Sequence, residues 1–228
     1  MKKISLILTI CLFTSAVWAQ KPGKWEKLFD GKTMKGWHAY RPDNPKKWMV
    51  MGGALMSHGG SGDLVSDKEY GDFELEFDFK IPPEANSGVI YKVIEDPKNA
   101  TSYSGPEYQI IDDENYPPFN DAGKMVKIND RQKTGANYDM QAPSNLKAVK
   151  PPGQWNKGRI KIKDNQVEHW LNGEKVVSYV YGSDDWKAQL AKSKFKTWSY
   201  ATPHTKGKIA LQDHSNEVWF NNIRIREL

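Results

Sequence analysis

Residues 72–81 constrain the fold of this chain more than any other segment, because every second side chain there is apolar over ten positions. One set contains Phe73, Leu75, Phe77, Phe79 and Ile81, and the other contains four carboxylates and Lys80. A β-strand separates two such sets, since successive side chains point to opposite faces of a sheet. The segment therefore predicts a strand, and Pro82-Pro83 ends it because proline cannot donate to the strand ladder.

The same period of two recurs along the chain, weakly at 87–94 and 107–112, strongly at 159–163 and 167–171, and again at 176–181, 208–213 and 217–225. Asp164-Asn165 and Asn172-Gly173 separate neighbouring segments and are typical of tight hairpin turns. One helix is expected from Ser183, a good N-cap residue, to about Phe195. This pattern indicates an all-β antiparallel sandwich or barrel with one short helix.

The first residues of the chain have the pattern of a secretion signal. Lys2-Lys3 precede a short apolar run that ends at Ala19, which suits cleavage by signal peptidase. The run is too short for a membrane anchor, and Cys11 lacks the small preceding residue of a lipoprotein signal. We therefore expect a signal peptide at 1–19, a single domain at 20–228, and a periplasmic or secreted protein without membrane insertion.

The composition of the remaining chain excludes several classes of protein. Removal of 19 residues from 228 leaves 209, without cysteine, so disulfide frameworks and cysteine-based zinc sites are excluded. The 33 basic residues fall to 31 against 28 acidic ones, which is too small an excess to indicate a nucleic-acid partner. No protein partner is predicted.

Nine short motifs occur in a fixed order from Leu28 to Ile225. They are Leu28–Thr33 with Gly36-Trp37, Trp48 before Gly52–Leu55, Asp72–Leu75, Asn86–Val89, Glu107–Ile110, Trp155-Asn156, His169–Gly173, Ile209–His214 and Phe220–Ile225. Together they resemble the 3-keto-disaccharide hydrolase domain family, whose members adopt a concanavalin A-like jelly roll. One departure is Tyr91-Lys92, where the family often has an aromatic residue followed by arginine, because lysine lacks the bidentate contacts of arginine. A second is Phe220-Asn221-Asn222, where Phe-Arg-Asn is frequent.

The resemblance implies an exported hydrolase that cleaves 3-keto-glycosides. A ketone at C3 of a sugar acidifies the hydrogen at C2, so the group at C1 can be expelled and water can then add. This route needs a base, an acid and a stabiliser of the enolate. Two alternatives stay open: a conventional glycosidase with two carboxylates, and a non-catalytic carbohydrate-binding domain on the same fold.

The candidate acid/base pair is Glu107 and His214. Alternation places Glu107 and Gln109 on one face of their strand, away from Tyr108 and Ile110, where they suit a concave face that binds sugar hydroxyls. The alternative is a solvated sheet face. His214 ends another strand, and a histidine can serve as acid or base because the unperturbed pKa of the imidazole is about 6.5. The residues expected to position substrate are Gln109, Asn86, Lys92, Tyr138, Trp155 and Asp112.

Other polar groups are interpreted as structural. His169 alternates with apolar residues and is expected in the core, and Asp213 is expected as a buried structural carboxylate. The acidic face formed by Asp72, Glu74, Glu76 and Asp78 is interpreted as solvated. The glycine-rich segment 59–62 is interpreted as a turn, because a phosphate-binding loop would continue into Lys-Ser/Thr and a helix.

Aromatic residues supply a second indication of sugar binding, because sugar rings pack their C–H faces on aromatic rings. Tyr138 lies within the long aperiodic segment 114–152 and Trp155 borders it, whereas Trp37 and Trp48 are expected in the core. No spacing typical of a metal site occurs, so no cofactor is predicted, although calcium is left open.

Overall fold

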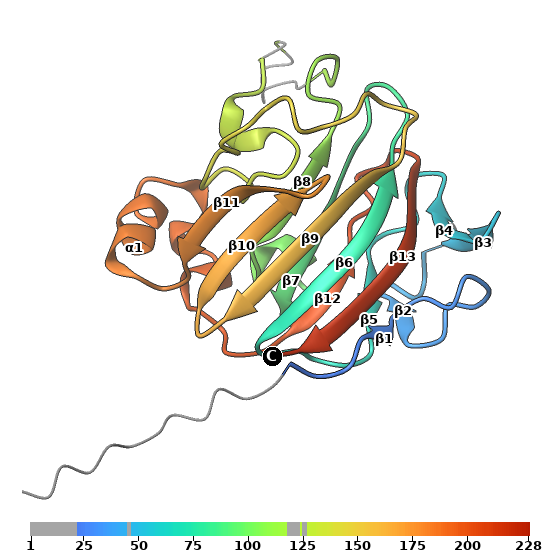
Figure 1. The fold of residues 1–228 in the computed structure, drawn as a ribbon, viewed down its shortest axis with the longest axis horizontal. Helices are drawn as coiled ribbons and strands as arrows, with labels where there is room; N and C mark the ends of the chain where they lie inside the picture. The colour runs from blue at the N-terminus through green and yellow to red at the C-terminus, as the bar shows by residue number, and fades with distance from the viewer. Residues whose placement is uncertain (1–21, 45–46, 118–123, 125–126) are drawn as a thin grey trace, which may run out of the picture.

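The computed structural model describes residues 22–44, 47–117, 124 and 127–228, which form two antiparallel sheets packed face to face (Figure 1). In order, the large sheet contains β11 (Glu174–Val180), β10 (Gln166–Leu171), β9 (Asn156–Lys163), β6 (Phe73–Lys80), β13 (Val218–Glu227), β4 (Ala54–Ser57) and β3 (Met49–Met51), with β1 (Glu26–Lys27) also on β13. The small sheet contains β2 (Trp37–Ala39), β5 (Leu64–Ser66), β12 (Lys208–Leu211), β7 (Asn86–Val93) and β8 (Glu107–Ile111). The predicted β-sandwich is confirmed, and residues 1–19 lie outside the described part.

The predicted hairpins are present, and their turns have the backbone conformation that their residues favour. Asp164 and Asn165 have φ of 49° and 63°, and Asn172 and Gly173 have φ of 51° and 90°. Positive φ at both central residues matches the right-handed twist of the flanking strands. These turns place β9, β10 and β11 side by side in sequence order.

The one α-helix of the described residues, α1 (Asp184–Leu190), is shorter than the predicted segment. Ser183 caps it as expected, since its hydroxyl oxygen accepts from the Trp186 N–H at 3.2 Å. The helix ends early because Ser193 caps a separate 3₁₀ turn, Lys194–Thr197, and accepts from the Phe195 N–H. No described helix has the length and apolar character needed to cross a membrane.

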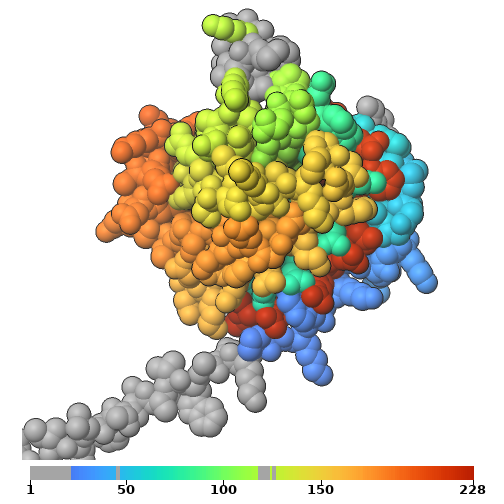
Figure 2. Space-filling model, turned by 45° about the horizontal axis from the view of Figure 1, so that its top comes forward, coloured from blue at the N-terminus to red at the C-terminus, as the bar shows by residue number. Residues whose placement is uncertain are grey.

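The core lies between the sheets and is rich in aromatic rings. The apolar face of β6 meets β8, where the rings of Phe77 and Tyr108 are 5.3 Å apart and nearly perpendicular. Trp37, Trp48 and His169 are buried there as predicted. The aperiodic residues 142–150 run along the large sheet, where the Ser144 N–H donates to the Val176 carbonyl (Figure 2).

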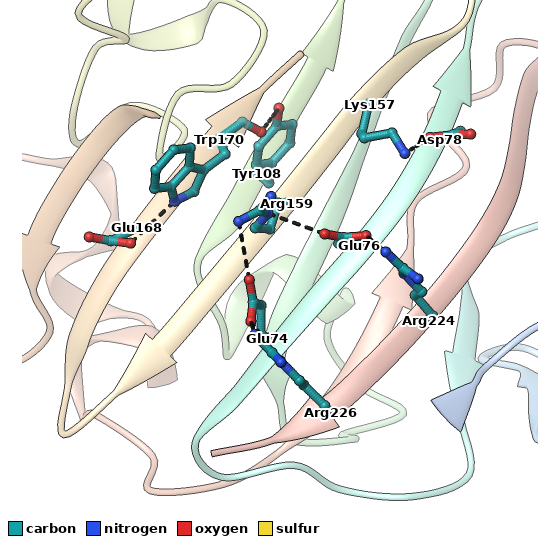
Figure 3. A network of polar contacts seen from close by, with 10 residues as sticks. All are labelled: Glu74, Glu76, Asp78, Tyr108, Lys157, Arg159, Glu168, Trp170, Arg224 and Arg226. Atoms are coloured by element: carbon teal, nitrogen blue, oxygen red, sulfur yellow. Dashed lines mark hydrogen bonds and ion pairs between the residues drawn. The ribbon is translucent and has the colours of Figure 1, made fainter. Parts of the chain in front are cut away.

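The acidic face of β6 is paired with arginines, so the prediction that it is solvated is wrong. Glu74 is only 4% exposed and Glu76 only 8%. Strand register places Arg224 and Arg226 of β13 directly opposite them, and Arg159 of β9 contacts both from the other side (Figure 3). Arginine forks satisfy several carboxylate oxygens at once, which permits this burial. The outer face of the large sheet therefore carries a network of ion pairs across β6, β9 and β13.

Candidate active site

A cavity of about 330 Å³ lies on the face of the small sheet that points away from the core. It contains five of the eight residues that the sequence predicts as functional: Glu107, His214, Gln109, Asn86 and Tyr138. Its walls come from segments 100–106, 137–138 and 194–200, and from the ends of β5 and β12. Alternation in β8 is the cause, because Tyr108 and Ile110 turn into the core and direct Glu107 and Gln109 outward.

Gly88 lies beneath the Glu107 carboxyl, at the base of the cavity. It pairs with Gln109 of β8, and its carbonyl accepts from the Gln212 N–H at 2.9 Å on the other side. A Cβ at position 88 would lie 2.3 Å from Glu107 Oε1, so the carboxyl group occupies the space that a side chain would fill. We call Asn86, Glu107, Gln109 and Gln212, the four polar side chains around Gly88, the polar floor.

Glu107 has the electrostatic surroundings of an acid/base group. Its side chain is 8% exposed, and burial raises its pKa to about 8. The charge of Asp63 raises the pKa further, whereas Lys194 opposes the shift. A carboxyl group that titrates near neutral pH can both accept and return a proton in one reaction cycle.

Asp63 is a pocket residue that the sequence analysis missed. It immediately precedes β5, and its carboxylate accepts hydrogen bonds from the Asp213 N–H at 3.0 Å and from the Thr101 hydroxyl. Burial raises its pKa above the ordinary value. The three-residue strand β5 is too short to give a periodic signal, so nothing in the sequence marked this position.

Lys194 is the second missed residue, and it places a positive charge beside Tyr138. Its ammonium nitrogen is 3.4 Å from the Tyr138 hydroxyl and 4.5 Å from the centre of that ring. Burial, with the charge of Glu107, raises the pKa of Tyr138 to about 12, so the phenol stays protonated. The predicted helix, from Ser183 to about Phe195, includes Lys194, and the neighbours of its side chain cannot be inferred from the sequence. Nearby, Trp198 stacks on Tyr103 with 4.1 Å between ring centres.

His214 lies at the exposed rim of the cavity, 3.5 Å from the hydroxyl of Tyr116. The preceding residue, Asp213, is structural as predicted. Its carboxylate accepts from the Ser57 hydroxyl at 2.6 Å and from the Gly60 N–H at 2.9 Å. The glycine-rich turn at 59–62 therefore wraps around a carboxylate of the chain itself.

Three residues predicted to position substrate do not lie in this cavity. Lys92 is 1% exposed and donates to the backbone carbonyls of Gly71 and Thr205, so it holds loops together. Asp112 accepts backbone N–H groups at the end of β8, including that of Glu84 at 2.9 Å. Trp155 is 38% exposed and lies 5.3 Å from the Lys80 ammonium instead.

A chain of buried hydrogen bonds from Tyr91 through His169 to Gly135, which we call the relay, connects the core to the cavity wall. His169 has its pKa lowered to about 4 by burial, so it is neutral, and its Nδ1–H donates to the Gly135 carbonyl at 3.0 Å. Its Nε2 therefore accepts from the Tyr91 hydroxyl at 2.8 Å. The segment after Gly135 pairs with β8: the Gln109 N–H donates to the Ala136 carbonyl, and the Tyr138 N–H donates to the backbone carbonyl of Glu107.

Among the described residues, no group of three or more histidine, cysteine or acidic side chains is placed to hold a metal ion. The cavity does contain orphaned polar atoms. Asn86 Oδ1 and Gln212 Oε1 on the floor, and Asn137 Oδ1 on the wall, are buried without a hydrogen-bond partner in the described structure. Buried acceptors of this kind are costly unless a ligand or water satisfies them. The polar floor is thus prepared for a ligand rich in hydroxyl donors.

Comparison with known proteins decides the family. The 3-keto-alpha-glucoside-1,2-lyase-like domain family matches residues 24–226. The chain belongs to this family. The resemblance seen in the nine motifs is therefore confirmed, and this family's match includes every residue of the cavity.

Members and neighbours of the 3-keto-alpha-glucoside-1,2-lyase-like family agree in fold. The chain is 35% identical to a 3-keto-disaccharide hydrolase from Bacteroides thetaiotaomicron, over 88% of this chain and 77% of the relative. A crystal structure from Parabacteroides distasonis, provisionally described as a glycosyl hydrolase, has a TM-score of 0.83 at 42% identity, covering 90% and 94% of the two chains. A Bacillus licheniformis β-glucanase shares the fold alone, with a TM-score of 0.50 at 10% identity, covering 92% and 100%. The concanavalin A-like jelly roll is thereby confirmed.

Proposed function

We propose that the protein hydrolyses the glycosidic bond of 3-keto-glycosides, with Glu107 as the principal acid/base group. The observation that carries this proposal is the Glu107 carboxyl, with its pKa raised to about 8, within the polar floor of a sugar-sized cavity. In the proposed reaction, the ionised form of Glu107 removes the proton at C2, and the electron pair moves toward the C3 oxygen as an enolate. The C1–O bond then breaks as the leaving oxygen is protonated, and water adds at C1 while C2 regains a proton.

The side chains around Glu107 can stabilise the negative charge that develops on the enolate oxygen and can protonate the leaving oxygen. Lys194 and the protonated Tyr138 form a cationic and hydrogen-bonding wall that favours an enolate oxygen. His214 at the open rim is the proposed proton donor to the departing sugar, which must leave through that side. The orphaned oxygens of Asn86 and Gln212 accept hydroxyls of the bound ring.

Enolate chemistry fits the cavity better than a two-carboxylate mechanism. Three carboxyl groups line it, but Asp63 and Asp213 each accept several hydrogen bonds from the chain itself. Within the described structure, Glu107 alone among the three accepts none. A conventional glycosidase needs two available carboxyl groups that flank the anomeric carbon, whereas here one available carboxyl stands beside a cation.

The test is turnover of a purified 3-keto-disaccharide beside its unoxidised parent. We expect release of free sugar from the oxidised compound only, a loss of at least about 1000-fold in E107Q, and a smaller loss in H214A. D185N, in the exposed first turn of α1, is the matched control and should retain full activity. Equal cleavage of both compounds would instead support a conventional glycosidase. Sugar binding without any turnover would support a binding domain.

We further propose that the reaction requires no cofactor, because the acid, the base and the enolate stabiliser are all side chains of the chain. Activity should survive dialysis against a chelator and should not rise when calcium is added. Loss of activity on chelation, with recovery by one divalent cation, would contradict this.

We also propose that the protein is exported to the periplasm or secreted, on the strength of the signal pattern at 1–19. The N-terminal sequence of protein recovered from the source cells should begin at Gln20. An uncleaved N-terminus in the cytoplasmic fraction would contradict the proposal.

A further inference from the structure

We propose that Gln109 recognises the ketone oxygen at C3 and so makes the cavity selective for oxidised sugars. This inference rests on the proposed function and adds a specificity-determining residue to it. Gln109 is only 1% exposed and lies on the polar floor, directly across the strand pair from Gly88.

The hydrogen-bonding direction of the Gln109 amide is fixed by its own backbone. The N–H of Ile110 donates to Gln109 Oε1 at 3.1 Å. A backbone N–H can only donate, so the atom that faces it must be the amide oxygen and not the amide nitrogen. The Nε2 group is consequently the part of this side chain that remains for a ligand, and it can only donate.

Two neighbours of Gln109 on the floor each present an amide oxygen that accepts no hydrogen bond from the described residues. Asn86 Oδ1 on β7 and Gln212 Oε1 beyond β12 are buried acceptors without partners in the described structure. The Nε2 donor of Gln109 thus lies beside two acceptor oxygens, on residues that flank Gly88. A 3-keto-sugar carries the matching pattern, since its C3 carbonyl only accepts and the hydroxyls at C2 and C4 can donate.

An unoxidised sugar fits this pattern less well. Its C3 hydroxyl can accept from Gln109 Nε2, but its hydrogen then needs an acceptor of its own. Gln109 Oε1 is already engaged by Ile110, and the C2 and C4 hydroxyls use Asn86 and Gln212. The third unpartnered acceptor of the cavity, Asn137 Oδ1, belongs to the wall segment 137–138 and not to the polar floor. A buried donor without an acceptor weakens binding by about 10- to 100-fold. The same Nε2 group also favours the enolate, because it donates toward the oxygen where negative charge develops.

The experiment measures binding in E107Q, which is not expected to turn over either ligand. Dissociation constants are determined by calorimetry for methyl 3-keto-α-glucoside and for methyl α-glucoside. We expect the oxidised ligand to bind about 10- to 100-fold more tightly. In E107Q/Q109E and in E107Q/Q109M this ratio should fall to within about twofold of unity.

The two substitutions at position 109 change the site in different ways, and the loss of the Nε2 donor is the one change that they share. Q109E keeps an oxygen that accepts from the Ile110 N–H, but it adds a negative charge. Q109M stays neutral, but it leaves the Ile110 N–H without this acceptor. Both remove the Nε2 donor. E107Q/Q166E is the matched control, because Gln166 is exposed on β10 of the large sheet and its change should leave the ratio unaltered.

The outcomes separate this inference from the proposed function. If the wild-type protein hydrolyses the oxidised substrate but E107Q binds both ligands equally, or both Gln109 variants keep the preference, the inference is overturned and the proposed function stands. If the wild-type protein does not hydrolyse the oxidised substrate, the proposed function itself fails. A collapsed ratio in both variants, with the control unchanged, supports the inference.

Discussion

Glu107 holds a proton at neutral pH that the unfolded chain would release. Its ordinary pKa is 4.5, and burial together with Asp63 raises the pKa in the folded protein to about 8. Between these two values the unfolded state is ionised and the folded state is protonated, so folding takes up a proton. The stability of the protein is therefore lowered progressively as the pH rises from about 4.5 to about 8.

E107Q should abolish this loss, because glutamine does not titrate. At pH 8.5 we expect the variant to be more stable than the wild type, by on the order of 3 kcal/mol, and at pH 4 the two should be nearly equal. Urea unfolding at both pH values measures the difference. E26Q, on the exposed strand β1, is the matched control. A gain in E107Q that is the same at both pH values would contradict the assigned pKa.

Single residues show where sequence reasoning succeeded and where it could not. Glu107 and Gln109 were found because alternation assigns a side chain to a face without any knowledge of tertiary structure. Lys194 and Asp63 were missed because their roles depend on which segments meet in space. Lys92 was predicted at the site from its position in a motif, but its side chain turns to two carbonyls that the sequence cannot locate.

At the scale of elements, the pairing of β7 with β8 builds the site. Register brings Gly88 beside Gln109 and leaves room over Gly88 for the Glu107 carboxyl. The sequence predicted both strands, but it did not predict their register or the contact between them. It also extended the helix through Lys194, because a serine that starts a second turn resembles an ordinary helical residue.

G88A should damage the site far more than the fold. Gly88 does not need a positive φ, so alanine fits the backbone, but its Cβ would lie 2.3 Å from Glu107 Oε1 and would displace the carboxyl. We expect kcat to fall by about 100-fold or more while the protein stays folded. G71A is the control, since its Cβ would meet only the Thr205 carbonyl oxygen at 3.7 Å. Full activity in G88A would show that the position of this carboxyl is unimportant.

For the molecule as a whole, the two sheets are joined by polar contacts as well as by apolar packing. Tyr91 of β7 bonds to His169 of β10 and to Tyr179 of β11, each at 2.8 Å. The sandwich and its alternating core follow from the sequence, whereas this connection does not. Tyr91 and His169 are 78 positions apart, and either could equally have been an ordinary core residue.

Y91F should therefore destabilise the sandwich although the ring is retained. The change leaves His169 Nε2 buried without a donor, which costs about 1–3 kcal/mol. Urea unfolding at pH 7 measures this loss. Y103F is the control, because the Tyr103 hydroxyl makes no hydrogen bond with the described residues and its ring stacks on Trp198 at the surface. Equal stability of Y91F and the wild type would rule out a structural contribution from the relay.

The segment after Gly135 has a consequence for behaviour at high concentration. β8 ends the small sheet, and an end strand exposes unpaired backbone groups that invite another chain to add a strand. Here the Gln109 N–H donates to the Ala136 carbonyl and the Glu107 carbonyl accepts from the Tyr138 N–H, so these groups of β8 are already paired. Mutations that loosen this segment should therefore promote self-association while they impair activity, so selection for solubility and selection for catalysis act on the same few residues.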